Sequence, residues 1–595
     1  MLRAFSKARS CCVPGRAFIE GWFIQQDVPW TQLDSNHLKE HGPQNWPEDI
    51  PPLVQRWMGA RGLHNFQDFL KFTNFSLKDL TDPFLLKGME EATDRLIKAF
   101  QDQDKICLYA DFDMDGTPGL ALLIQGLQFC GFQKLLSFQP NRFEDGYGVH
   151  SEIVEEFINN HEVSLFVTVD VGITAIEAVQ RAKDLGVDFI ITDHHQPKEI
   201  LPPAYAIVNP NQGHCPSGME HLCGAGVAFY LVLALRKKMV ERGLLQKNFD
   251  PKVLLDCFAI GTLSDMVPVI KENRALIQHG LLQLERTSRP GLRLLMDELK
   301  LTGKRLNSAD VSIQFSPKLN ALGRMDSDVQ ALDLFLAQSE PEAKQLVVQT
   351  LEAQKQRAEI QAQGEATLFA KIANKLEGLS FVFEYSEDFY KGIVGLIATK
   401  SVGQLQVPSF IGTVIGDKIV GSARAPEGQS LLKALEAVSE HLVQFGGHHQ
   451  AAGFELSLAN ASLFYQSLES YYQDFVPVPP VLKYDCVATL SELDLEFKNW
   501  FRKLEPYGVG FERPLLHLDH LFVSQIKVLK EKHLKLTLSD MDGNKIEALW
   551  FFADNIEEKK QLSTKRVSVV VQPSINEYMG RETLQVLIKD LKVEY

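Results

Sequence analysis

Hydrophobic and polar positions change their spacing along the chain, and these changes divide it into segments. In residues 53–100 the apolar positions recur at irregular helical spacing, which predicts a small leading helical segment. From Lys105 onward, short β-rich runs alternate with helical stretches; the runs are residues 106–110, 165–169, 189–191 and 206–208. Alternation of this kind predicts a parallel α/β sheet.

The second half of the chain shows three further patterns. Residues 339–375 are rich in Gln, Glu, Ala and Lys and contain no proline after Pro341, which predicts one long connecting helix. A second α/β unit follows, and the V-P-V-P-P run at 476–480 is interpreted as a linker. Alternating β-type runs such as 533–538 and 567–571 then favour a small barrel or sandwich.

These patterns predict an α/β protein of several domains, as expected for 595 residues. The predicted parts are an N-terminal leader (1–52), an α/β domain with its leading helical segment (53–335), the connecting helix (336–378), a second α/β domain (379–475) and a C-terminal β domain (481–595).

Composition narrows the class of protein. Hydrophobic residues make up 45% and charged residues 23%, which is typical of a globular chain. We find no uninterrupted apolar run of about 18 residues, so we expect no membrane span. Eight cysteines without a C-x-x-C pair indicate a reducing compartment, and we predict a cytoplasmic protein.

Charge adds two observations. The first nineteen residues carry four basic and no acidic residues, a pattern that fits either a solvated leader or an organellar transit peptide. The formal net charge is -15, so any nucleic acid must bind in a local basic groove rather than over the whole surface.

The first candidate chemistry lies in L-Y-A-D-F-D-M-D-G at 108–116. Asp111, Asp113 and Asp115 follow a predicted strand, and alternate residues of an extended segment face one side. Three converging carboxylates repel one another unless they bind a divalent cation. The alternative is a calcium loop of EF-hand type, but the glutamate at its twelfth position is missing and a strand, not a helix, precedes it.

Two further predicted strands also end in acids or imidazoles. One ends in V-T-V-D-V-G at Asp170, and the next in I-I-T-D-H-H at Asp193, His194 and His195. Ligands bind at the carboxyl ends of strands in open parallel sheets, so we expect these residues to share one crevice with Asp265, a fourth candidate. A single aspartate there is usually only a helix N-cap. Mixed carboxylate and imidazole ligation favours manganese or magnesium over zinc.

A competing cluster consists of His214, Cys215, His221 and Cys223. These side chains are of the types that bind zinc, but their spacing matches no standard structural zinc site. We therefore interpret the cysteines as packing or loop residues.

Six motifs occur in an order that resembles the DHH phosphoesterase superfamily. They are D-F-D-M-D-G, V-T-V-D-V-G, T-D-H-H, L-C-G-A-G-V-A-F, G-T-L-S-D-M-V-P and P-K-L-N-A-L-G-R-M. Within the superfamily, the chain resembles the RecJ single-strand-specific exonucleases from residue 53 to its C-terminus. Two later segments, F-G-G-H-H-Q-A-A-G and L-E-P-Y-G-V-G-F-E-R-P, are similar to the DHH-associated domain and to the start of an OB-type barrel.

The resemblance implies two divalent cations, Mn²⁺ or Mg²⁺, that share one bridging aspartate. Asp170 would be the bridge, with Asp111 and Asp113 on one metal and Asp115, His194 and Asp265 on the other. Asp193 would orient the imidazoles. His195, Arg324 and His448 would contact the phosphate, and the remaining substrate contacts would be Lys318, Asn320, Arg424, Gly446 and Gly447.

The chain departs from the family pattern at four positions. Val171 and Phe511 stand where the family usually has asparagine, Lys318 where it has arginine, and Tyr390 where it has histidine. None of these is an implied metal ligand. They concern substrate contact, because a lysine cannot reproduce the bidentate contact of an arginine.

The implied activity is 5′-to-3′ hydrolysis of single-stranded DNA to 5′-mononucleotides by a monomer, with a helicase and single-strand-binding protein as partners in repair and recombination. One alternative is a DHH phosphodiesterase acting on short oligonucleotides or cyclic dinucleotides; such relatives lack the C-terminal barrel. Another is a non-catalytic single-strand-binding scaffold, which would have lost metal ligands.

Overall fold

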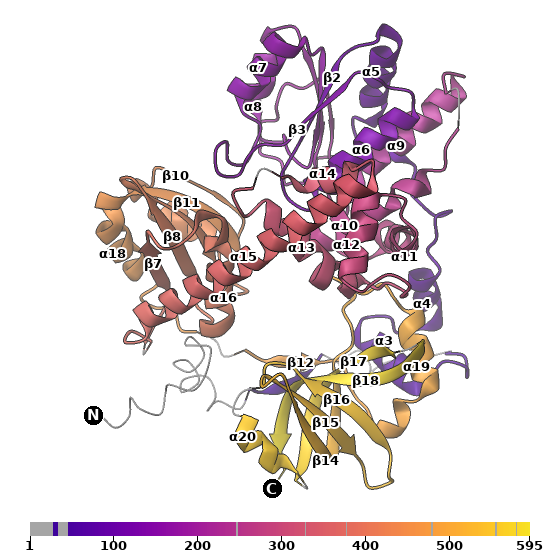
Figure 1. Cartoon of the computed structure of the whole chain (residues 1–595), viewed down its shortest axis with the longest axis vertical. Coiled ribbons are helices and arrows are strands. Elements are labelled where there is room, and N and C mark those ends of the chain that lie inside the picture. Colours follow the sequence, from indigo (N-terminus) through magenta and orange to yellow (C-terminus); the bar gives the residue numbers. More distant parts are fainter. Residues whose placement is uncertain are drawn as a thin grey trace.

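The computed structural model describes residues 28–33 and 46–594 except 246–247, 328, 377, 478–479, 554–555, 564 and 579. Most of the predicted leader (1–27 and 34–45) therefore lies outside the described residues. Figure 1 shows a domain with a parallel sheet, a second α/β domain beside it and a C-terminal barrel below, and this confirms the predicted fold class.

A five-stranded parallel sheet forms the first domain, with strand order β3-β2-β4-β5-β6. Its strands are β2 (Ile106–Ala110), β3 (Leu135–Phe138), β4 (Leu165–Val169), β5 (Asp188–Thr192) and β6 (Ala206–Val208). Only β3 was not predicted, because this edge strand is half-buried and has a weak apolar signal. The chain crosses from β3 past β2 to β4, so the carboxyl ends of β2 and β4 form the switch point at which such sheets bind ligands.

Helices cover both faces of this sheet. The largest core contains α5 (Met89–Asp102), α6 (Gly116–Phe129), α9 (Gly224–Glu241) and α10 (Leu255–Asp265), and the opposite face is covered by α7 (Ser151–His161) and α8 (Ile176–Asp184). Leu165 and Val167 face the first core and Phe166 the second. Burial on both faces explains why the strands read as unbroken apolar runs.

Further helices complete the first domain. They are α11 (Lys271–Glu285), α12 (Pro290–Glu298), α13 (Ser316–Leu322) and α14 (Ala331–Leu336). A π-helical turn at Asp310–Phe315 leads directly into α13. In the part of the chain that the structure covers, no helix combines the length and the apolar character needed to cross a bilayer.

The predicted connecting helix is α15 (Glu340–Ile372), which Figure 1 shows passing from the first domain to the second. Ser339 caps its N-terminus, because the Ser339 hydroxyl accepts a hydrogen bond from the Glu342 N–H. Val347 belongs to the core of the first domain and Leu368 to that of the second. Residues 354–363, between these two contacts, bury no side chain completely.

The second domain contains a mixed sheet of order β10-β11-β9-β8-β7 in which only β7 and β8 run parallel. Its strands are β7 (Val382–Ser386), β8 (Ser409–Ile415), β9 (Lys418–Arg424), β10 (Gln444–Gly447) and β11 (Ala451–Ser457). The helices are α16 (Val394–Leu405), α17 (Leu431–Ala437) and α18 (Ala461–Tyr471).

The C-terminal region is a closed five-stranded barrel. Its strands are β14 (Leu516–Leu529), β15 (His533–Ser539), β16 (Lys545–Trp550), β17 (Arg566–Tyr578) and β18 (Arg581–Val593). β14 pairs with both β15 and β17, and this closes the barrel. The short α20 (Ile556–Lys559) lies between β16 and β17 in the chain, and the whole has the topology of an OB fold.

The leading helices α3 (Pro52–Ala60) and α4 (Phe66–Thr73) pack on the barrel side, which differs from their predicted grouping with the first domain. The buried Trp57 stacks on Phe511 with ring centroids 6.0 Å apart. Strand β1 (Trp30–Gln32) pairs in parallel with β12 (Leu482–Tyr484) and so also joins the barrel side. An apolar helix face indicates burial but not the surface against which it is buried, so the sequence could not decide this point.

Candidate active site

The carboxyl ends of β2, β4 and β5 carry the central side chains of the site. Asp111, Asp170 and Asp193 each follow a strand directly. Their backbone N–H groups donate to Val169, Thr192 and Val208, at 3.2, 3.0 and 3.1 Å. Each bond continues the sheet ladder one residue past the strand, so the three side chains are held side by side at the switch point.

Asp113 and Asp115 reach the same place through a turn, so the expected alternation along an extended segment is wrong. Asp113 Oδ1 accepts from the N–H groups of Asp115 (2.8 Å) and Gly116 (3.0 Å). The Asp115 carboxylate accepts from Gly224 N at 2.5 Å and Ala225 N at 2.9 Å. It therefore lies against the N-terminus of α9, where the helix dipole stabilises a negative charge.

Asp265 arrives from the end of a helix instead of a strand. It is the last residue of α10, and Met266 ends the helix with a left-handed backbone (φ 61°). Within the described residues, three groups of side chains offer ligand atoms that lie within 4.8 Å of one another. The groups are Asp111, Asp113 and Asp170; Asp115, His194 and Asp265; and Asp170, His194 and His195.

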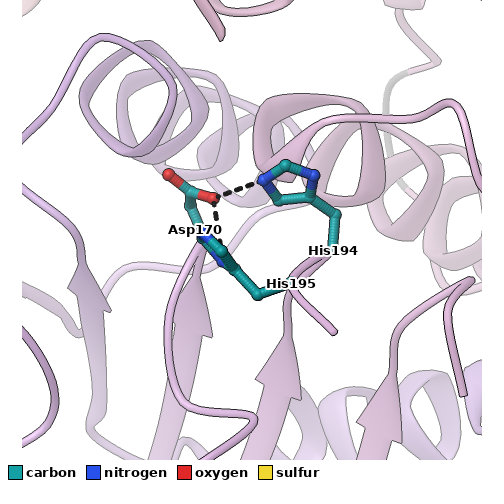
Figure 2. A group of neighbouring side chains, drawn as sticks. All are labelled: Asp170, His194 and His195. Carbon is teal, nitrogen blue, oxygen red and sulfur yellow. Dashed lines mark ion pairs between the residues drawn. The ribbon is translucent and has the colours of Figure 1, made fainter. Parts of the chain in front are cut away.

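Asp170 connects these groups. Figure 2 shows His194 and His195 facing its carboxylate, with Oδ1 3.2 Å from His194 Nε2 and 3.8 Å from His195 Nδ1. This oxygen is buried and has no hydrogen-bond partner in the described part of the chain. The backbone of Asp170 is left-handed (φ 62°), a conformation that costs free energy and that occurs often at functional sites. Gly224 permits the close packing, because a Cβ there would lie 2.4 Å from the Asp170 Cβ.

Burial and mutual repulsion disturb the ionisation of the acids. Burial raises the pKa of Asp111 and Asp170 well above the ordinary value, and neighbouring carboxylates raise it further. The same causes raise the pKa of Asp265 to about 8. Burial lowers the pKa of His194 and so favours the neutral imidazole that binds metals. The donor set therefore fits divalent cations, which offset the accumulated negative charge.

Asp193 orients His195 more directly than His194. Its Oδ1 lies 2.8 Å from His195 Nδ1, whereas its contact with His194 is to the backbone N–H at 2.7 Å. Burial would raise the pKa of Asp193, but the hydrogen bond with His195 lowers it. Burial opposes protonation of His195, yet Asp193 raises its pKa to about 9. The imidazolium is therefore the main form at neutral pH.

The second domain adds residues to the same site. The His448 ring stacks on His195, with centroids 6.2 Å apart and planes at 6°. Gly446 and Gly447 end the exposed edge strand β10 directly before His448. Arg324 donates to the Gly392 carbonyl at 3.4 Å, and a Cβ on Gly392 would lie 1.9 Å from the Arg324 carbonyl oxygen. The two domains thus touch at the edge of the site.

Three arginines lie near the aspartates: Arg142, Arg324 and Arg424 form no ion pair with any described residue. In addition to burial, the charges of Arg142 and Arg424 lower the pKa of Arg324, and the charge of Arg142 lowers that of Arg424. Arg142 is not among the residues predicted from the sequence, and its guanidinium lies 4.4 Å above the Phe112 ring. Tyr147, whose ring edge faces His195 at 6.3 Å, was not predicted either. The signal for both is their position in the loop after β3, a fourth strand that points to the switch point.

The four departures from the family pattern have different surroundings. Val171 is buried, and Phe511 packs on Trp57 in the barrel-side core, away from the aspartates. The Tyr390 hydroxyl accepts from the Asp326 N–H at 2.9 Å, and its ring packs on Phe143. Tyr390 therefore serves the contact between the domains.

Two more predicted substrate residues, Lys318 and Asn320, lie half-buried on α13. The four residues of the competing zinc cluster do not appear in any of the three ligand groups found among the described residues. His221 Nε2 instead contacts Glu272 at 2.7 Å, and Cys223 Sγ contacts Thr262 at 3.4 Å.

The strand order and the aspartate–histidine cluster at the switch point define a DHH-type phosphoesterase, and residues 105–262 match the DHH family, N-terminal domain. Residues 484–590 match the RecJ OB domain. The single-stranded-DNA-specific exonuclease RecJ of Haemophilus influenzae is 32% identical over 90% of this chain and 95% of its own length. RecJ of Escherichia coli is 31% identical over 92% and 96%. The chain therefore belongs to the RecJ family.

Solved structures agree with this assignment. RecJ of Thermus thermophilus in complex with Mn²⁺ has a TM-score of 0.77 at 25% identity and covers 95% of this chain and 79% of its own. A second structure, an exonuclease RecJ bound to manganese, is 30% identical with a TM-score of 0.57 and covers 66% and 96%.

Proposed function

We propose that the chain is a metal-dependent exonuclease that degrades single-stranded DNA from the 5′ end and releases 5′-mononucleotides. One observation carries the proposal: the ligand groups joined by Asp170 lie beside three arginines that form no ion pair with any described residue, and the charges of Asp111 and Asp113 act on Arg142. The RecJ relatives named above, which are single-stranded-DNA-specific exonucleases, support the choice of substrate.

The residues that would hold a pair of Mn²⁺ or Mg²⁺ ions are those of the first two ligand groups, with Asp170 between them. They are Asp111, Asp113, Asp115, Asp170, His194 and Asp265. The orphaned Asp170 Oδ1 supports this assignment. When bound, two such ions activate a water molecule and offset charge on the phosphoryl oxygens.

The protein's own cations would bind the phosphate that is to be cleaved. Asp193 holds His195 through a 2.8 Å hydrogen bond and favours its protonated form, and His448 stacks on its ring. A fixed imidazolium in a buried site stabilises the charge that grows on a phosphoryl oxygen during displacement. Asp193 would position this cation without touching the substrate.

The three arginines suggest how a strand end is recognised. Arg424 Nη1 donates to Ser422 Oγ at 2.7 Å, and a Cβ added at Gly395 in the first turn of α16 would lie 3.0 Å from Arg424 Nη2. Arg142 and Arg324 converge on the same place. An internal phosphodiester carries one negative charge, whereas a terminal phosphate carries almost two. A group of three guanidiniums with a helix N-terminus fits the terminal phosphate, and this would restrict cleavage to an end.

The remaining parts of the proposal rest on the family resemblance. The OB barrel would bind the strand that leads into the site. The protein would act as a cytoplasmic monomer, with a helicase and single-strand-binding protein as partners in repair and recombination.

Digestion of a single strand tests the proposal. Strands with a 5′-phosphate and a 3′-fluorophore would be incubated with the protein and Mn²⁺, with the Asp170→Asn variant as control. We expect mononucleotides from the 5′ end and an inactive variant. If the fluorophore-labelled 3′ end were released first, the proposed 5′-to-3′ polarity would be wrong. Cleavage of dinucleotides alone would indicate a short-substrate phosphodiesterase, and binding without cleavage would indicate a scaffold.

A further inference from the structure

The middle of α15 lies between two hydrophobic cores without belonging to either. Residues 354–363 bury no side chain completely, whereas Ala353 and Gly364 on either side of this stretch are buried. Arg357 lies half-buried within the stretch. A helix that only joined two domains would not need a half-buried cation at this position.

Arg357 is held against the beginning of α13. The Gln354 side chain, with its amide oriented to suit both neighbours, donates to the Pro317 carbonyl at 2.9 Å and accepts from Arg357 Nη2 at 3.1 Å. Lys318, the residue after Pro317, is also half-buried. Arg357 is therefore fixed near the start of α13, close enough to Lys318 for its charge to act on that side chain.

No acidic side chain neutralises this pair in the part of the chain that the structure describes. Neither Arg357 nor Lys318 forms an ion pair there. Burial lowers the pKa of Lys318, and the charge of Arg357 lowers it further. Adjacent uncompensated cations repel each other, so the arrangement costs free energy unless an anion binds between them.

We propose that Arg357 and Lys318 together bind an internucleotide phosphate of the single strand, downstream of the nucleotide that is cleaved. This inference rests on the proposed function. Lys318 lies on α13, and Arg324 follows the end of this helix. Arg357 is close enough to Arg324 for its charge to lower the pKa of Arg324, so the pair adjoins the arginines assigned to the terminal phosphate. The connecting helix is then part of the DNA path.

The pair also accounts for Lys318, which stands where the family usually has arginine. A lysine offers a point charge, while the planar guanidinium of Arg357 can contact two phosphate oxygens at once. Arg357 would thereby supply the bidentate contact that Lys318 cannot make.

Salt-dependent binding tests the inference without any cleavage. The affinity for a 5′-phosphorylated 12-mer would be measured in EDTA between about 50 and 200 mM salt for the wild type and for Arg357→Gln. Loss of one phosphate contact should lower the slope of log Kd against log salt by about 0.7 and weaken binding about tenfold. Lys355→Gln removes an exposed charge from the same helix and should change neither value.

A second variant and a shorter ligand separate contact from structure. Lys318→Arg introduced into the Arg357→Gln protein should recover most of the affinity, because it restores a guanidinium at the phosphate. The 12-mer should lose more affinity than a 5′-phosphorylated dinucleotide, which is too short to reach the pair. An unchanged salt slope, or an equal loss on both ligands with a lower melting temperature, would overturn the inference. The inference would also be overturned if Arg357→Gln lowered the affinity for an acidic peptide such as polyglutamate but not the affinity for DNA.

These outcomes do not depend on the proposed activity. Failure of the wild type to degrade DNA would refute the exonuclease proposal but leave the salt slope intact. An unchanged slope in a chain that still degrades DNA would refute only the role of Arg357.

Discussion

His195 and His448 stack almost parallel, with ring centroids 6.2 Å apart, although they belong to different domains. His195 follows β5 of the parallel sheet, and His448 follows β10 of the second domain. The site is therefore complete only when the second domain stays close enough to the first for His448 to reach His195. Contacts such as Arg324 with Gly392 fix the distance between the domains within hydrogen-bonding range.

Asp170→Asn should have opposite effects on activity and on stability. Activity in Mn²⁺ should fall on the order of 10³-fold, because the proposed bridging ligand is lost. In EDTA the melting temperature should rise, because the change removes a carboxyl group whose ionisation is opposed by burial and by neighbouring carboxylates. Enzyme assays and thermal melting of the same samples measure both effects. A lower melting temperature in EDTA would contradict the repulsion described for the site.

The metal-free protein should lose stability as the pH rises from about 4 to about 8. The pKa of Asp265 rises from 3.8 to about 8 on folding, mainly through burial, so the folded state binds the proton more tightly than the unfolded state does. A raised pKa stabilises the fold at low pH, and this stability is lost as the pH passes through the folded value. Melting temperatures in EDTA between pH 5 and 8.5 should fall, and Mn²⁺ should remove most of the fall. A flat profile in EDTA would show that the acids are not coupled in this way.

Gly392→Ala should separate the two domains at the site. The new Cβ would lie 1.9 Å from the Arg324 carbonyl oxygen, so the backbones must move apart. A displacement of about 1 Å can reduce a rate about 100-fold, and we expect a loss of that order in kcat/KM on single strands. Gly403→Ala is a matched control on α16, because a Cβ there meets no atom within 4 Å. Equal activity of the two variants would refute the role of this contact.

Arg142→Gln should reduce the preference for a 5′-phosphate over a 5′-hydroxyl. Loss of one charged contact should lower kcat/KM for the phosphorylated strand about 10- to 100-fold. The hydroxyl-terminated strand should be affected much less. Arg181→Gln, which breaks a surface ion pair with Glu155, serves as the control. An equal loss on both strands would assign Arg142 to the scissile phosphate instead.

Much of the fold and most of the candidate site could be predicted because the signals are local. Buried strands such as β4 read as apolar runs, and the acids follow them directly in the sequence. The placement of the Asp115 carboxylate could not be predicted, since it depends on the N–H groups of Gly224 and Ala225 far along the chain. Arg142 was missed because β3, the strand before its loop, has a weak apolar pattern and was not predicted.

The packing of α3 and α4 has a consequence for synthesis. These helices are synthesised more than 400 residues before their hydrophobic partners, such as Phe501 and Phe511. At usual translation rates of about 5 to 20 residues per second, the delay is on the order of half a minute or more. During that interval Trp57 and its apolar neighbours stay exposed to solvent. The nascent chain is therefore prone to aggregation until the barrel has been synthesised.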